Sequence, residues 1–526
     1  MHRTSWRISR LASFFRHSLI VLGCALWLGG VQAAENRGSY QAALESITAA
    51  DLGHYAGRLA DKDLEGRMSG TRGGHAAGDY LVAQLTHLHL HPAGADGSFF
   101  QPFAPNFRNV LAMLTGGDDA LRNQVIVVGA HYDHVGYGGR GLSLDPGGAI
   151  HPGADDNASG TSAVLKLADA FTRLASPPKR SILFAFWDAE ERGLLGTKHW
   201  TAHPTLPLSH VVAALNLDMI GRLRKNHLAI FGSRTGVGWR RLLSCENDAT
   251  GFDLEFPWTL KPNADHYTFF DHGIPVVMMH TGLHPDYHRV TDTADRLNRE
   301  GMMEVTRFVF AVAYRLAERS VPPAFRPAAR HENEPMRREV LAQHGQPPDR
   351  LEVGWASDAT AAGRVRISRI TPGSPAERAG LQVGDCIRQV AGRRIHNEDD
   401  FVAAVSSAAS PALLTVEREG ERRPLKLVVQ LSGAPLRWGI TWRLDDAEPG
   451  TIILAYVVPY SPAAAAGLRI GDRIYQVDGR DFADEATFIR WSKTLRGPIS
   501  LLIERHGRLR TMVLQLQQSQ PVKRAA

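Results

Sequence analysis

The sequence predicts an α/β domain with a mostly parallel sheet and helices on both faces, followed by two small domains of a common type. Two observations lead to this fold class. Short apolar runs alternate with helix-periodic stretches between residues 120 and 320, a pattern typical of consecutive strand–helix–strand units. Beyond residue 340, a set of short motifs occurs twice at a constant separation, which indicates a tandem duplication.

Four runs in the first region are almost entirely apolar, so we expect them to be strands buried on both faces. They span residues 124–130 (QVIVVGA), 181–187 (SILFAFW), 211–217 (VVAALNL) and 274–279 (IPVVMM). In a sheet of this kind the ligand crevice lies beyond the carboxyl ends of the strands. The side chains that follow these runs are therefore the first candidates for a functional site.

Acidic and imidazole side chains stand at these strand ends. In chain order they are His131, Asp156, Glu190, Glu191, Asp218 and His288. Carboxylate oxygen and imidazole nitrogen are the usual non-thiolate ligands of zinc-like ions, so the set predicts two divalent cations and metal-assisted hydrolysis. Five ligands close two sites only if one is shared. Asp156, in the turn-forming stretch GADDNASG (153–160), is the expected bridge.

Each of these residues also has an ordinary structural interpretation. A strand-end histidine can simply be hydrogen-bonded, Asp155-Asp156 can cap a helix, and Glu190-Glu191 can be a solvated helix start. Their joint occurrence at the ends of apolar runs, in one domain and in a consistent order, favours the metal interpretation.

Five segments carry a resemblance to a known family. They are HYDHVG (131–136), HPGADDNASGT (151–161), FWDAEERGLLGT (186–197), LNLDMIGR (215–222) and TGLHPDYHRVTDT (281–293). Residues 40–320 thereby resemble the dizinc aminopeptidase family, which includes glutamate carboxypeptidase and glutaminyl cyclase and has the zinc exopeptidase fold. The resemblance implies that His131 and Asp218 hold one zinc ion, that Glu191 and His288 hold the other, and that Asp156 bridges them.

Three further residues are expected to take part in the reaction. Glu190, beside a predicted ligand but not itself claimed by a metal, is a candidate base that passes a proton from water to the leaving amine. Asp133 stands two residues after His131, where it can accept the second ring N–H of that ligand or cap the loop. Tyr287 precedes His288 and, by resemblance to some relatives, polarises the scissile carbonyl; packing against the ligand loop is its alternative role.

The duplicated region repeats three short motifs. SPA (374–376), AGL (379–381) and GD (384–385) recur 87 residues later as SPA (461–463), AGL (466–468) and GD (471–472). The two copies, residues 345–432 and 435–519, each resemble a PDZ domain of bacterial envelope proteases. The resemblance implies β-rich domains that bind carboxyl-terminal peptides along a sheet edge. Val353-Gly354-Trp355 and Trp438-Gly439-Ile440 are the candidate carboxylate loops, unless the copies only pack on the catalytic domain.

The amino-terminal residues 1–33 have the features of a secretory signal peptide. Four arginines precede the apolar stretch SLIVLGCALWLGG (18–30), and small residues follow it. We therefore expect an exported protein, periplasmic or secreted, with no stable membrane span after cleavage. The strongly apolar residues after Cys24 argue against a lipid anchor. Residues 321–344, rich in proline and mixed charge, are expected to be a linker.

Composition sets further limits. With 44% hydrophobic residues the chain is globular, and its 526 residues exceed what a single core organises. Loss of the signal's four arginines lowers the formal charge from +6 to +2, so no nucleic-acid partner is inferred. Cys245 and Cys386 remain after cleavage, in different predicted domains. They are expected to be buried thiols, without a disulfide and without a role as zinc ligands.

These features support three interpretations. The favoured one is an exported dizinc aminopeptidase that acts on peptides with a free amino terminus, while the PDZ pair recruits or regulates substrates. A second keeps the metals but changes the specificity to that of a carboxypeptidase, a dipeptidase or a glutaminyl cyclase. A third is a peptide-binding protein with an inactive peptidase-like domain, which the presence of Glu190 disfavours.

Overall fold

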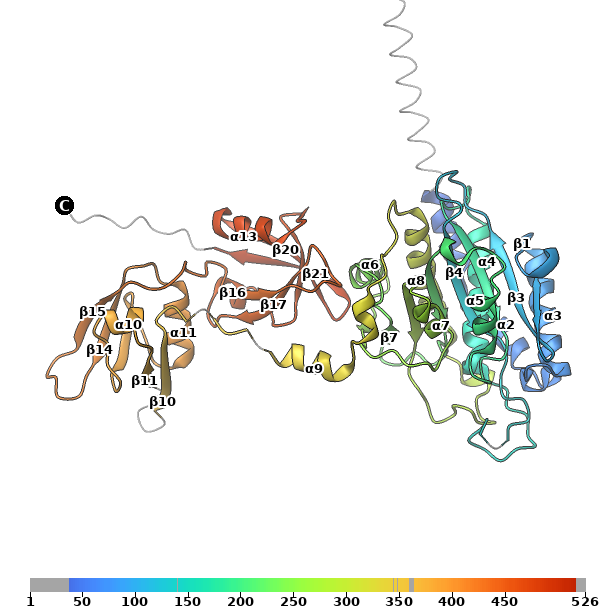
Figure 1. The fold of residues 1–526 in the computed structure, drawn as a ribbon, viewed down its shortest axis with the longest axis horizontal. Coiled ribbons are helices and arrows are strands. Elements are labelled where there is room, and N and C mark those ends of the chain that lie inside the picture. Colours follow the sequence, from blue (N-terminus) through green and yellow to red (C-terminus); the bar gives the residue numbers. More distant parts are fainter. Residues whose placement is uncertain (1–36, 140, 344, 348, 359–363, 517–526) are drawn as a thin grey trace, which may run out of the picture. The chain divides into compact units, whose positions relative to one another are not determined.

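The computed structural model describes residues 37–139, 141–343, 345–347, 349–358 and 364–516 (Figure 1). The chain divides into two compact units. The first contains residues up to 236 together with 252–329, and the second contains residues 237–251 together with those from 330 onward. The expected signal segment, residues 1–33, lies outside the described residues. Among the described residues, no helix has both the length and the apolar character that a membrane crossing requires.

A nine-stranded mixed sheet forms the centre of the first unit, with strand order β1-β3-β5-β4-β6-β9-β7-β8 and β2 paired to β3. The strands are β1 (His91–Pro92), β2 (Phe100–Phe103), β3 (Phe107–Leu114), β4 (Val125–His131), β5 (Ser181–Trp187), β6 (Val211–Leu217), β7 (His227–Phe231), β8 (Asp253–Glu255) and β9 (Val276–His280). The four expected apolar runs correspond to β4, β5, β6 and β9, which form the parallel centre. Strands β3 and β7 join its flanks antiparallel.

Helices cover both faces of this sheet (Figure 1). They are α2 (Ala49–Leu59), α3 (Arg72–His87), α4 (Gly160–Thr172), α5 (Leu195–Ala202), α7 (His266–Asp271) and α8 (Arg299–Glu318). Strand β5 is buried along its whole length, because alternate side chains meet different helices. Phe184 packs against Phe171 of α4, whereas Trp187 packs against Trp200 of α5 and Phe269 of α7. The expected α/β class with two covered faces is confirmed.

The second unit contains two six-stranded antiparallel sheets with the same strand order. The first sheet has β10 (Val353–Asp358), β11 (Arg364–Ile370), β12 (Cys386–Val390), β13 (Arg393–Arg394), β14 (Ala412–Glu417) and β15 (Leu425–Val429). The second has β16 (Ile440–Arg443), β17 (Ile452–Val457), β18 (Arg473–Val477), β19 (Arg480–Asp481), β20 (Pro498–Arg505) and β21 (Arg508–Gln515). Helices α10 (Pro375–Arg378) and α11 (Glu398–Ser407) accompany the first, and α12 (Pro462–Ala465) and α13 (Glu485–Thr494) the second.

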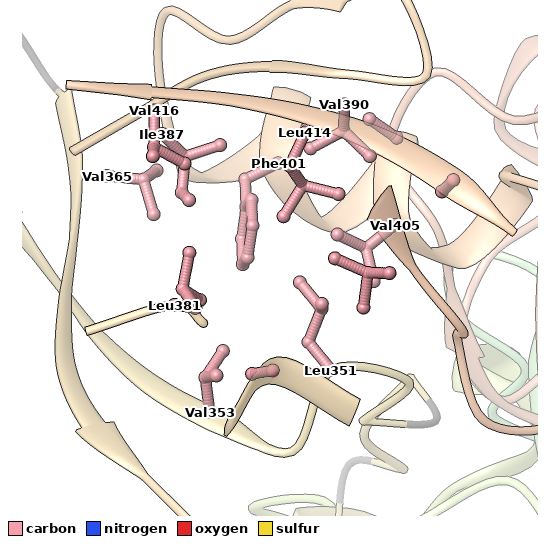
Figure 2. Close-up of a cluster of buried hydrophobic side chains, with 14 of the residues drawn as sticks. Leu351, Val353, Val365, Leu381, Ile387, Val390, Phe401, Val405, Leu414 and Val416 are labelled. Atoms are coloured by element: carbon pink, nitrogen blue, oxygen red, sulfur yellow. The ribbon is translucent and has the colours of Figure 1, made fainter. Parts of the chain in front are cut away.

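Each small sheet folds over its own apolar core. In the first, Phe401 of α11 lies among Leu351, Val353 and Leu414 (Figure 2). In the second, Phe488 of α13 has the equivalent position, 87 residues later, and is fully buried. Burial of a phenylalanine side chain contributes about 1.5–3 kcal/mol, so each core supports a separate small domain.

The 87-residue repeat also recurs in polar contacts. Arg418 donates from Nε to Oδ1 of Asp385 at 2.7 Å, and Arg505 donates to Asp472 at the same distance. Both aspartates are buried. They belong to the repeated Gly-Asp motif. In both copies the carboxylate of this motif therefore binds an arginine at the end of a neighbouring strand.

Two segments differ from the sequence expectations. Helix α9 (Glu334–Ala342) forms within the expected linker, because Asn333 accepts a hydrogen bond from its first turn. Helix α6 (Trp239–Glu246) clusters with the second unit, although its chain neighbours belong to the first. Cys245, at the end of α6, is exposed, whereas Cys386 is buried as expected.

The segment expected to form the first carboxylate loop lies within a strand. Val353-Gly354-Trp355 belong to strand β10. The left-handed turn falls one residue earlier, at Glu352 with φ +60°, and its equivalent 87 residues later is Gly439 with φ +75°. A glycine marks this turn in the second copy, and a glutamate occupies the same position in the first.

Candidate metal centre

The parallel centre of the first sheet brings the expected ligands to one edge. His131 ends β4, Asp218 follows β6, and Glu191 lies four residues after β5. Asp156 lies in the turn that precedes α4, and His288 lies in the loop after β9. The ligand atoms fall into overlapping groups that each lie within 4.8 Å of one another: His131, Asp156 and Asp218 form one, and Asp156, Glu191 and His288 belong to another.

Asp156 belongs to both groups because its two oxygens face different histidines. Oδ1 lies 3.4 Å from Nε2 of His131, and Oδ2 lies 2.9 Å from Nε2 of His288. Asp218 approaches the same nitrogen of His131 at 3.6 Å, and Glu191 approaches that of His288 at 3.2 Å. Burial alone raises the pKa of Asp156, but hydrogen bonds with the two histidines hold it well below its usual range.

Glu190 lies beside this cluster and joins a third group with His131 and Glu191. Its pKa is raised well above the usual range, because burial and the charges of Glu191, Asp265 and Asp218 outweigh the opposing effect of His131. A buried carboxyl group with a raised pKa beside the cluster is a candidate for general acid–base chemistry.

Asp133 connects Glu190 to His131. Its Oδ1 accepts a hydrogen bond from the backbone amide of Glu190 at 3.0 Å and lies 3.6 Å from Nδ1 of His131. The backbone carbonyl of Asp133 is closer to that nitrogen, at 3.2 Å. Ser69 donates to Oδ2 at 2.8 Å. The fully buried Asp133 carboxylate therefore fixes two neighbours, whereas the sequence predicted only the contact with the histidine.

The turn that carries Asp156 is held by Asp292, four residues after His288. Its Oδ2 accepts the backbone amides of Asp155 at 2.9 Å and Asp156 at 3.1 Å, and its own carbonyl accepts the amide of Ala154. The peptide bond between Asp156 and the following residue is cis. No local sequence signal marks Asp292, because its partners lie more than 130 residues away.

His134 is a further member of the cluster that the sequence interpretation missed. Its Nδ1 lies 2.9 Å from Oε1 of Glu191, and it belongs to the group with Asp156 and His288. Its Nε2 is buried and has no hydrogen-bond partner among the described residues. Only its place three residues after His131 could have pointed to it.

Tyr287 lies against one ligand of the cluster. Its ring stacks on that of His288, with centroids 4.0 Å apart and planes inclined by 28°. Burial and the negative charges of Asp156 and Glu191 raise the pKa of the phenol. The hydroxyl is therefore a proton donor at every physiological pH.

The donor atoms of the cluster fit a metal ion. Four carboxylates converge with three imidazoles in a mostly buried volume; they belong to Asp156, Glu190, Glu191, Asp218, His131, His134 and His288. Oxygen and nitrogen donors in this ratio suit zinc. The mutual repulsion of the carboxylates also favours cations between them.

Comparisons with known proteins agree with this chemistry. Residues 109–313 match the model of peptidase family M28, and residues 366–418 and 453–505 match that of the PDZ domain. Aminopeptidase YwaD of Bacillus subtilis is 26% identical over 210 residues, which cover 38% of this chain and 42% of the relative. A probable leucine aminopeptidase 2 of Aspergillus fumigatus is 27% identical over 344 residues, which cover 56% and 64%.

The chain thus spans less than two thirds of the length of these relatives. Among solved structures, the LapA aminopeptidase of Legionella pneumophila is 22% identical, with a TM-score of 0.46 over 54% of this chain and 75% of that one. The resemblance of the first region to the aminopeptidase family, and of the two repeats to PDZ domains, is confirmed by the family matches.

Proposed function

Because this chain joins a peptidase domain of family M28 to two PDZ domains, we propose that it is an exported dizinc aminopeptidase that removes residues from free amino termini. The observation that carries the proposal is the position of Asp156, whose two oxygens face His131 and His288. A carboxylate in this position suits two cations that share it.

In this proposal His131 and Asp218 would hold one zinc ion, Glu191 and His288 would hold the second, and Asp156 would be shared between them. Bound zinc lowers the pKa of water and polarises the scissile carbonyl. The protein's part is to keep the donors in place, through hydrogen bonds such as those that hold the turn of Asp156.

Glu190 moves the proton. It accepts a proton from the attacking water and gives it to the departing amine, a task for which its raised pKa is suited. Asp133 is a positioning residue, since it holds the backbone of Glu190 and faces the ring of His131. Tyr287, stacked on His288, donates a hydrogen bond that polarises the scissile carbonyl.

The relatives named as aminopeptidases support cleavage at the amino terminus. We expect the processed chain to bind two zinc ions and to hydrolyse leucine anilide but not its N-acetylated form. A chelator should abolish the activity, and added zinc should restore it. Cleavage of the acetylated substrate, release of residues from the carboxyl terminus, or cyclisation of glutaminyl peptides would each redirect the proposal within the family. Full activity without a bound transition metal would overturn it.

Export is proposed from residues 1–33, whose basic and apolar segments match a signal peptide. The test is the intact mass of the protein from the periplasmic and culture fractions, which should begin at Ala34. The PDZ pair is proposed to bind polypeptides along its sheet edges and so to recruit or regulate substrates. That role is tested by binding of labelled peptides to the full chain.

A further inference from the structure

The first PDZ domain has an apolar groove between β10 and α11. A cavity of about 250 Å³ lies there. Its lining includes Leu351, Val353, Trp355, Phe401 and Val405, and Figure 2 shows Leu351, Val353, Phe401 and Val405 within the buried cluster of this domain. Strand β10 is an edge strand of its sheet, so an extended polypeptide can pair with it and place side chains in the cavity.

The end of this groove already holds a carboxylate. Oδ1 of Asp349 accepts the backbone amides of Glu352 at 2.6 Å and of Val353 at 3.3 Å. These amides flank the left-handed turn at Glu352, which is where a nest of N–H groups captures a peptide's terminal carboxylate. Asp349 also lines the cavity. The backbone amides of Glu352 and Val353 are therefore already hydrogen-bonded to a carboxylate of the same chain.

Arg350 lies near Asp349, but its guanidinium is already hydrogen-bonded to the backbone. Arg350 lines the same cavity, but its guanidinium donates to the carbonyls of Val405 and Ala408, at the end of α11, and to that of Ser432. Its polar hydrogens are thus engaged with the backbone. A terminal carboxylate that entered the groove would meet the negative charge of Asp349, and it would find donors of Arg350 already bonded to backbone carbonyls.

The second PDZ domain lacks this internal carboxylate. The residue 87 positions after Asp349 is Leu436, whose side chain cannot accept a hydrogen bond, and Glu352 corresponds to Gly439. Both turn residues have positive φ, +60° and +75°, so the backbone has the same handedness in the two copies. The copies therefore differ at this point by one internal carboxylate rather than by their fold.

We propose that the first PDZ groove binds internal, extended segments of polypeptides, which carry no terminal carboxylate, while the second PDZ domain, which has leucine in place of Asp349, keeps the preference for chain ends. An internal segment needs only the edge of β10 and the apolar cavity, and both are present. A chain end would have to displace Asp349 from two amides, and donors of Arg350 are already bonded to backbone carbonyls. The inference rests on the proposed peptide-binding role of the PDZ pair.

The test compares one peptide in two forms. A fluorescent hexapeptide ending in valine is titrated as the free acid and as the carboxyl-terminal amide, by anisotropy, against the full-length chain. Ile489→Glu places a charge in the second groove, at the position equivalent to Val402 of the first cavity, so that the first groove is measured. We expect the acid to bind no more tightly than the amide, and Asp349→Ala to tighten only the acid, by about tenfold.

A reciprocal variant provides the matched control. In a Val402→Glu background, which leaves the second groove to be measured, Leu436→Asp installs the carboxylate and should remove that groove's preference for the acid. The amide's affinity in each variant shows that the groove is intact. A tenfold preference for the acid in the unmodified first groove, or an unchanged ratio in Asp349→Ala, would overturn the inference alone. Absence of binding by either peptide in every variant would overturn the proposed peptide-binding role as well.

Discussion

The imidazole Nδ1 of His134 lies 2.9 Å from Oε1 of Glu191. This contact joins a residue that follows strand β4 to one that follows β5, and it fixes the orientation of a proposed zinc ligand. The same glutamate uses its other oxygen, at 3.2 Å from Nε2, to face His288. The two oxygens of Glu191 thus divide between two histidines, as those of Asp156 do.

His134→Ala should weaken zinc binding by about 10–100-fold, because loss of a contact to a ligand's second oxygen lets that ligand rotate. Competition with a chromogenic chelator measures the affinity. His134→Gln, which keeps a side-chain donor, should recover part of the loss. If His134→Ala bound zinc as tightly as the unmodified chain, the orienting role would be wrong.

Glu190→Gln should retain two zinc ions and lose activity by about 10²–10⁴-fold, because the amide cannot carry the proton. Metal analysis and the leucine anilide rate, measured on the same preparation, separate these effects. Glu65→Gln, which changes a glutamate at a partly exposed position outside the cluster, serves as the charge control. A metal-loaded Glu190→Gln protein with near-normal turnover would exclude the proposed base.

Asp133→Asn preserves size but removes the charge that faces His131, and it replaces one acceptor oxygen by a donor. We expect a loss of about 10–100-fold in metal affinity or turnover, together with a shift of the pH–rate profile, since Asp133 also holds the amide of Glu190. Asp133→Glu tests position rather than charge. A profile that keeps its shape in Asp133→Asn would indicate a purely structural residue.

Glu504→Gln should make the second unit less stable at neutral pH. Burial raises the pKa of Glu504, but the charges of Arg240 and Arg473, together with hydrogen bonds from Arg240 and the backbone amide of Gly507, lower it to about 2. A depressed carboxyl pKa contributes stability that is present above the usual value of 4.5 and is lost as the pH falls toward 2. The contribution is about 3 kcal/mol. Urea unfolding at pH 7 and pH 3 should show a difference between variant and parent that shrinks in acid.

The strands at the centre of the first sheet were predictable because they are apolar on both faces. Residues 181–187 and 211–217 coincide with β5 and β6, and a strand's last residue defines which side chains reach the crevice. The edge strands were not predictable, because β1 has only two residues and β8 only three. Short strands of that kind depend on their partners rather than on their own sequence.

Within the candidate site, the predicted ligands could be inferred because they follow apolar runs in a consistent order, whereas the residues that hold those ligands in place could not. Asp292 and His134 act through contacts that fold the chain back on itself, and no spacing rule reports such contacts. Asp349 is similar in kind, since its role depends on which amides point toward it. Gly439 marks the turn in the second copy and could be recognised from the sequence. Glu352, at the same turn of the first copy, carries no such signal.

One loop carries both His288 and Asp292, and the latter grips the turn of Asp156 through three backbone amides with its carboxylate and carbonyl. Displacement of that loop would move His288 out of the cluster and would also release the turn that carries Asp156. Binding of zinc at the two proposed sites should therefore be all-or-none. A titration of the empty protein would then rise cooperatively, with singly loaded molecules scarce at every zinc concentration.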